Sequence, residues 1–163
     1  MLGFRVALFE QSFLHVGVVG GSVENADGFD ADFCKGTVAH CYFNNTGNDA
    51  IDFSTSVVTI RDSKIKNAGD KGISMGEQGT ATIINTSIDG AVIGIASKDL
   101  SKTTVTNVTL KNCLTGFSAY QKKPEYGHGF IKVNSYESDN SGTLHKILPG
   151  SKLILVGQEI LGK

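Results

Sequence analysis

Apolar and polar residues alternate along short stretches of this chain. The segments GFDADF (28–33), AIDFS (50–54) and GISMG (72–76) place apolar residues at every second position over four or five residues. A period of two over so short a distance is typical of β-strands with one buried face, and it excludes an amphipathic helix. The pattern therefore predicts many short strands separated by bends.

The same pattern returns every 22 residues. Each copy has a bulky apolar residue after a small one, and these bulky residues are Phe29, Ile51, Ile73, Ile95 and Phe117. Two more apolar ladders keep this spacing, apart from one extra residue near Glu77: Val38, Ile60, Ile83 and Val105, and then Phe43, Ile65, Ile88 and Leu110. A repeat of this length has no room for a crossover helix, so equivalent residues are expected to stack in successive turns of one coil.

The ladders predict an all-β fold, a single-stranded parallel β-helix (solenoid) with about 22 residues per coil. Asparagines that recur at a turn, such as Asn45 and Asn67, are expected to hydrogen-bond from coil to coil. Residues 1–133 are expected to form the repeat domain, and residues 134–163 a polar linker with a capping strand. A cap protects the unpaired backbone groups of an open end. The apolar chain ends are also typical of a segment of a longer solenoid.

The segments VTIRDSKIKN (58–67) and VTNVTLKN (105–112) carry a shared motif. The motif resembles the right-handed β-helix repeat of the pectin-lyase-like superfamily, and the resemblance covers about residues 18 to 120. It implies a right-handed coil and an extracellular or cell-surface location. The superfamily contains pectate and alginate lyases, polygalacturonases, uronan epimerases, phage tailspikes and non-catalytic surface proteins, so the fold does not decide the function.

Net charge, hydropathy and cysteine spacing speak against nucleic-acid binding, membrane insertion and a disulfide or zinc framework. The 15 basic and 16 acidic residues give a net charge of -1, so no overall field attracts nucleic acid. No apolar segment is long enough for membrane insertion. The three cysteines form no CxxC pair, which speaks against a disulfide framework or a zinc site. The oligomeric state has no signal in the sequence.

Aspartates gather in two of the repeats. Strand alternation points Asp30 and Asp52 outward, and the 22-residue spacing stacks one above the other, about 4.8 Å apart. Asp27 and Asp49 form a second stacked pair at the bend before these strands. Like charges at this separation raise a pKa or attract a cation. The next repeat has Lys71 in the column of Asp27 and Asp49.

Three interpretations of these charges remain open. In the first, the aspartates serve the bends through local hydrogen bonds or face solvent. In the second, they bind calcium, with hard oxygen ligands from Asp27, Asp30, Asp49 and Asp52. In the third, they form a carbohydrate active site.

For that active site, Asp30 and Asp52 would divide the acid and base roles, or Lys71 would be the base beside bound metal. Substrate would contact the nearby polar residues Glu77, Lys98 and Tyr120, the last by stacking its ring on a sugar.

We therefore expect a carbohydrate-associated β-helix that binds or processes an extended, acidic polysaccharide on an outer sheet face. If the protein is an enzyme, it is expected to be a polysaccharide lyase, an epimerase or a glycoside hydrolase. The alternative is a non-catalytic structural or surface-interaction module whose aspartates serve the turns or bind calcium. A long and regular coil suits a polymeric partner in either case.

Overall fold

The fold was examined in a computed structural model, which describes residues 4–6, 10–14, 19–21, 25–139 and 142–163. The described residues contain strands, turns and bends, and no helix. The strands are β1 (Phe4–Val6), β2 (Glu10–Leu14), β3 (Val19–Gly21), β4 (Phe29–Asp32), β5 (Lys35–Ala39), β6 (Tyr42–Thr46), β7 (Ile51–Ser54), β8 (Val57–Arg61), β9 (Lys64–Ala68), β10 (Lys71–Gly76), β11 (Thr80–Lys98), β12 (Lys102–Tyr120), β13 (Phe130–Val133), β14 (Tyr136–Asp139), β15 (Thr143–Ile147), β16 (Lys152–Leu155) and β17 (Gln158–Leu161).

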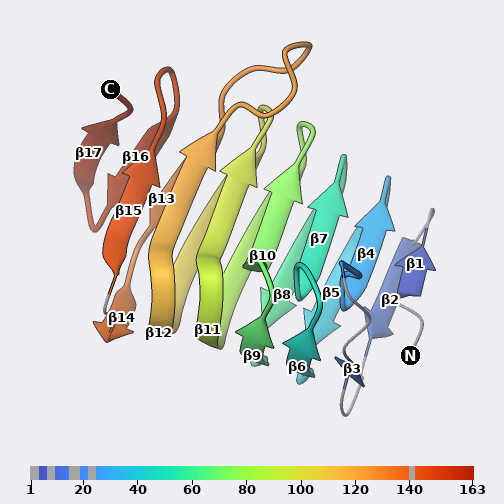
Figure 1. The fold of residues 1–163 in the computed structure, drawn as a ribbon. Coiled ribbons are helices and arrows are strands. Elements are labelled where there is room, and N and C mark those ends of the chain that lie inside the picture. The colour runs from blue at the N-terminus through green and yellow to red at the C-terminus, as the bar shows by residue number, and fades with distance from the viewer. Residues whose placement is uncertain (1–3, 7–9, 15–18, 22–24, 140–141) are drawn as a thin grey trace.

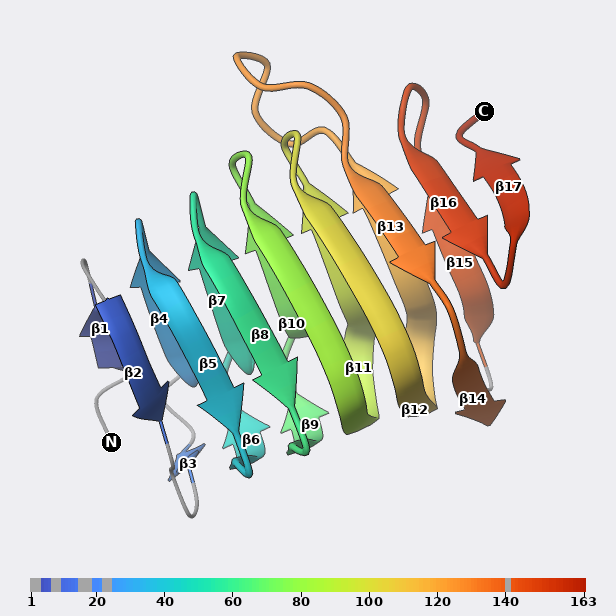
Figure 2. The same cartoon turned by 180° about the vertical axis from the view of Figure 1, so that it is seen from behind.

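Successive coils lie side by side, and each strand pairs in parallel with its equivalent in the next coil (Figures 1 and 2). We name three sheets after the strands that they contain. The first sheet consists of β1, β4, β7, β10, residues 93–98 of β11, residues 115–120 of β12, and β15. The second consists of β2, β5, β8, residues 80–84, residues 102–106, β13, β16 and β17. The third consists of β3, β6, β9, residues 87–89, residues 109–111 and β14.

The strand register confirms the apolar ladders. Ile51 pairs with Phe29 on one side and with Ile73 on the other, and the ladder continues through Ile95 to Phe117. All five side chains are buried in the core that the three sheets enclose. The extra residue of the third copy lies in the turn between β10 and β11, because Gly76 pairs 22 residues back and Thr80 pairs 23 residues back. The all-β parallel coil predicted from the sequence is thus confirmed.

The corners of the coil are built from residues with left-handed backbone conformation. Asn45 and Asn67 have φ values of 55° and 54°, and Asn85 and Asn107, at the preceding corner of later coils, have 47° and 53°. Asparagine tolerates this region better than other residues with a side chain. Asn67 donates a hydrogen bond to Asn45 across 2.9 Å, and Asn107 donates one to Asn85 across 2.8 Å. These contacts confirm the predicted asparagine stacking.

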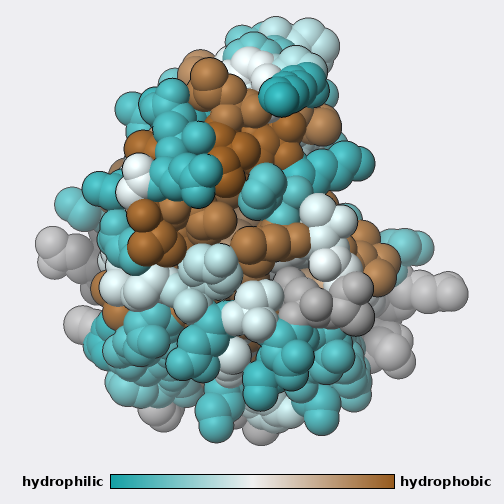
Figure 3. Space-filling model, turned by 90° about the vertical axis from the view of Figure 1, so that its left-hand side faces the viewer, coloured by the Kyte–Doolittle hydropathy of each residue, from teal (hydrophilic) through white to brown (hydrophobic). Residues whose placement is uncertain are grey.

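The parallel coil continues past residue 133. Both β14 and β15 pair in parallel with β12, and β16 pairs in parallel with β13. Among the strands of the described residues, only β17 has the antiparallel pairing expected of a closing strand. In this last coil Ser138 and His145 replace the core residues Leu110 and Phe117. Viewed end-on in Figure 3, this end of the coil combines apolar and polar surface.

The loop between β12 and β13, residues 121–129, projects beyond the ends of the strands (Figure 2). Its base is fixed by Asp99, a fully buried residue in the turn before β12. One carboxylate oxygen of Asp99 accepts the backbone N–H groups of Lys122 and Lys123 across 2.6 and 2.8 Å. The side chain of Lys123 also forms an ion pair with Glu77. These contacts tie the loop to the two preceding coils, next to the C-terminal ends of the first-sheet strands.

Candidate functional site

The outer face of the first sheet carries the predicted aspartate column. Asp30 is in register with Asp52, and Asp52 with Ser74, while the backbone of Arg5 precedes Asp30. Asp30 and Asp52 are half-buried, whereas Ser74 is fully buried although it points away from the core. An outward residue becomes buried when longer neighbouring side chains cover it. The face is therefore a packed layer of charged side chains rather than a row of solvated ones.

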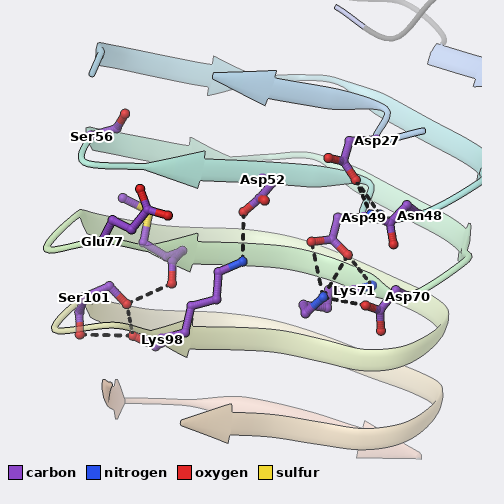
Figure 4. A network of polar contacts seen from close by, with 12 residues as sticks. Asp27, Asn48, Asp49, Asp52, Ser56, Asp70, Lys71, Glu77, Lys98 and Ser101 are labelled. Carbon is purple, nitrogen blue, oxygen red and sulfur yellow. Dashed lines mark hydrogen bonds and ion pairs between the residues drawn. The ribbon is translucent and has the colours of Figure 1, made fainter. Parts of the chain in front are cut away.

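Lys98 is one of the long side chains of this face. It starts on β11, two coils beyond Asp52, and its ammonium lies 3.5 Å from an Asp52 carboxylate oxygen (Figure 4). The lysine side chain is only 6% exposed. Gly76 permits this route, because a Cβ at that position would lie 2.9 Å from the Lys98 Cε atom. The contact thus depends on residues from three different repeats.

A second lysine, Lys71 of β10, lies at the other end of the same face. Its ammonium is 3.2 Å from one Asp49 oxygen and 2.5 Å from an Asp70 oxygen (Figure 4). The Asp49 side chain is 3% exposed and that of Lys71 is 11% exposed, so water screens this pair weakly. Asp49 also accepts the backbone N–H of Lys71 across 3.0 Å. The two residues therefore join adjacent coils through both side chain and backbone.

Burial sets the protonation behaviour of this cluster. It raises the pKa of Asp49 to about 6, although the nearby charge of Lys71 acts in the opposite direction. Burial would lower the pKa of Lys71, but hydrogen bonding to Asp70 and the charge of Asp49 outweigh it and raise that pKa. The ammonium therefore keeps its proton at neutral pH, which suits an electrostatic partner better than a proton donor or acceptor.

The acidic residues divide into two groups. Asp27 accepts hydrogen bonds from the Asn48 side chain and the Asp49 backbone, both across 2.9 Å, and burial raises its pKa. Ligand oxygens of Asp27, Asp30 and Asp52 all lie within 4.8 Å of one another. Oxygen atoms on opposite sides of a calcium ion are about 5 Å apart, so these three carboxylates could act as ligands of one ion. Asp49, the fourth predicted ligand, instead faces Lys71.

The predicted substrate-binding residues surround this layer. Tyr120 lies partly buried at the end of β12, and burial raises its pKa to about 12, with Lys71 lowering and Asp49 raising that value. Tyr120 therefore lies in the electrostatic field of the lysine–aspartate cluster. Glu77 lies in the turn after β10 and is engaged by Lys123 of the loop. Lys98 is inside the layer rather than at its rim.

Sequence reasoning missed three residues of this site. Asp70 contacts Lys71, and its place immediately before that lysine was the only signal available. Lys123 and Asp99 act through the loop, which interrupts the repeat and therefore has no column from which to infer contacts. The repeat spacing predicts the charged residues that it aligns from coil to coil. It does not predict the contacts of the inserted loop.

The coil of parallel strands, with its inward apolar ladders and left-handed corners, defines a protein of the β-helix class. A family model described as "Right handed beta helix region" matches residues 15–156, and the chain belongs to this family. The match agrees with the resemblance to the pectin-lyase-like superfamily. Comparison with curated proteins and with solved structures gave no match. In the described part of the chain, no helix has the length and apolar character needed to cross a membrane.

Proposed function

We propose that this protein binds an extended, acidic polysaccharide along the outer face of the first sheet. The observation that carries the proposal is the packing of Asp49, Lys71 and Lys98, all at most 9% exposed, into one outward-facing layer. Burying charges has a large desolvation cost, and a solenoid surface does not require it. Buried charges with perturbed pKa values, grouped on one face, are typical of functional sites.

The charge balance of this face suggests how an anionic polymer would bind. In the cluster around Lys71 and Lys98, aspartates outnumber lysines by five to two, and these residues are Asp27, Asp30, Asp49, Asp52, Asp70, Lys71 and Lys98. An acidic polymer would be repelled unless a cation lies between the two surfaces. Calcium held by Asp27, Asp30 and Asp52 would supply that bridge. The ring of Tyr120 would then offer a stacking surface for a sugar.

The same arrangement limits the catalytic roles. Lys71 is held as an ammonium between two carboxylates, so it fits an electrostatic partner better than a base or a proton donor. Asp30 and Asp52 remain the candidates for an acid and base pair, because they are adjacent on the outer face. Lyase and epimerase chemistry would use the bound cation to stabilise negative charge on the uronate. These roles depend on the polymer being a substrate as well as a ligand.

The proposal is tested by binding measurements on a panel of uronate-containing and neutral polysaccharides, each with calcium and with chelator. We expect binding of a uronate polymer that is lost on chelation and weakened at least about tenfold by Asp52→Asn. The matched control is Asp89→Asn, which removes the same charge from the third sheet. New reducing ends and the absorbance of unsaturated uronates, followed on the same samples, test for hydrolysis and elimination.

A non-catalytic structural or surface-interaction module is the second candidate. It is favoured by the backbone hydrogen bonds of Asp27 and Asp49, each of which caps an N–H of the following coil. Part of the acidic cluster therefore already has a structural role. Failure of the wild-type protein to bind or alter any polysaccharide in the panel would refute the first proposal and support this one. Equal binding by Asp52→Asn and wild type would place the polymer elsewhere on the coil.

A further inference from the structure

The path of Lys98 is unusual for a surface lysine. Lysine on the outside of a protein normally keeps its ammonium in water, with only its stem against the surface. Lys98 instead lies along the sheet, passes over Gly76 and ends at Asp52, and the whole residue is 5% exposed. Its ammonium therefore occupies the edge of the acidic group formed by Asp27, Asp30 and Asp52.

The polar groups near this lysine are poorly satisfied. Ser74 is adjacent to Asp52 in the same outward column and is 0% exposed. Within the described residues, neither the Ser74 hydroxyl nor Oδ1 of Asp52 has a hydrogen-bond partner. Buried polar groups in proteins are nearly always paired, so a fully enclosed and unpaired hydroxyl next to Asp52, one carboxylate of the acidic group, points to a missing partner. The Lys98 ammonium, 3.5 Å from Asp52, gives charge neutralisation without completing that hydrogen bonding.

The two lysines of this face differ in how firmly they are held. Lys71 has two carboxylate partners, with closest distances of 3.2 and 2.5 Å. In the described part of the chain, Lys98 has one ion pair, at 3.5 Å, with Asp52. The backbone N–H of Lys71 also donates to Asp49, so Lys71 and this partner are joined through both backbone and side chain. A ligand that competes for carboxylates would therefore displace Lys98 first.

We propose that Lys98 is a tethered counter-cation of the acidic group, and that a divalent cation displaces it and releases its ammonium toward the polysaccharide. The proposal rests on the function proposed above and describes the regulation of the same site. Displacement frees Asp52 for the metal and exposes a positive charge where the anionic polymer would lie. Calcium binding and polymer binding would then strengthen each other, because each favours the same displaced position of the lysine.

The test compares calcium binding by wild type, Lys98→Met and Gly76→Ala, measured calorimetrically with calcium chloride alone. Lys98→Met keeps an apolar stem next to Gly76 but removes the competing charge, so we expect a calcium Kd about tenfold lower. Gly76→Ala leaves the net charge unchanged and displaces the Lys98 stem by steric contact, so its Kd should fall in the same direction. Lys66→Met, which removes one positive charge from the third sheet, controls for net charge.

Polymer binding in saturating calcium separates the two proposals. Lys98→Met should bind calcium more tightly than wild type and the uronate polymer more weakly, because the released ammonium is missing. A calcium Kd of Lys98→Met equal to that of Lys66→Met overturns the role of Lys98, while calcium-dependent polymer binding by wild type would leave the proposed function intact. Absence of calcium binding in all four proteins overturns both the tethered-cation role and the calcium bridge. Circular dichroism confirms that each variant is folded.

Discussion

The outer faces of the first and third sheets differ in the order in which their charged residues stack. On the third sheet, Lys66, Asp89, Lys111 and Asp139 follow one another in register, so each charge has opposite neighbours. On the first sheet, Asp30 is followed directly by Asp52. Both columns have the same strand spacing of about 4.8 Å, so the geometry of the backbone does not explain the difference.

The contrast shows how a structural charge can be told from a candidate functional one on a repetitive fold. The third-sheet column is neutralised by its own neighbours, as cross-strand pairs of opposite charge normally are. On the first sheet, Asp52 is instead neutralised by a lysine from outside its own column, because Lys98 crosses a coil to reach it, while Lys71 pairs with its column neighbour Asp49 and with Asp70. Neutralisation of Asp52 by a lysine two coils away distinguishes the first sheet from the third, and it makes the charges of the first sheet the candidates for a functional role.

The largest expected effect comes from removing the buried lysine of the first sheet. Lys71→Met leaves Asp49 buried without its cationic partner, and we expect the free energy of unfolding at pH 8 to fall by about 3–5 kcal/mol. Urea unfolding measures this change. The loss should shrink at pH 5, because Asp49 can then take up a proton and become neutral.

The matched variant on the third sheet is Lys66→Met. Its side chain is exposed, so we expect a loss below about 1 kcal/mol at either pH. Adding Asp49→Asn to Lys71→Met should restore much of the lost stability, because the buried charge is then gone from both partners. Similar losses for Lys71→Met and Lys66→Met would show that the two faces do not differ in the way proposed.

A smaller effect is expected from the titration of Asp49. Its pKa rises from 3.8 to about 6 on folding, so the native state binds more protons than the unfolded state between these values. Stability from this group is therefore present at low pH and is lost as the pH rises from about 4 to about 6. Relative to Asp49→Asn, the wild type should lose up to about 3 kcal/mol across this window. Parallel stability curves for the two proteins would contradict the assignment.

Most of the fold could be predicted because the 22-residue repeat determines the length of each coil and the pairing of its strands. The spacing of Phe29, Ile51 and Ile73 fixed both the coil length and the inward direction of these side chains, and the register agrees. The same spacing placed Asp30 on Asp52. The coil was expected to end at residue 133, whereas β14 and β15 continue the parallel pairing. Their core positions hold Ser138 and His145, so the apolar ladder that identifies a coil is absent there.

For the site, the sequence predicts only which residues are stacked in the same column from coil to coil. Periodicity gives the strand neighbour of a residue but not the direction of a long side chain. The contact of Lys98 with Asp52 depends on the space left by Gly76 in the coil between them. Likewise, the pairing of Glu77 with Lys123 depends on a loop that occurs once. The path of a long side chain and the contacts of an inserted loop depend on the tertiary structure. The spacing of the repeat therefore does not predict them.

The smallest effect would come from rebuilding the like-charged arrangement on the third sheet. Lys111→Asp places an acidic residue between Asp89 and Asp139, without any long lysine directed at it from another coil in the described structure. We expect a loss of about 1 kcal/mol at low salt in urea unfolding, reduced in 1 M salt because these side chains are accessible to solvent. Lys111→Gln separates lost attraction from new repulsion, since it removes the positive charge alone. If Lys111→Asp is as stable as Lys111→Gln, a stacked acidic column has little intrinsic cost on this coil. The lysines of the first sheet would then have to be explained by ligand binding rather than by relief of repulsion.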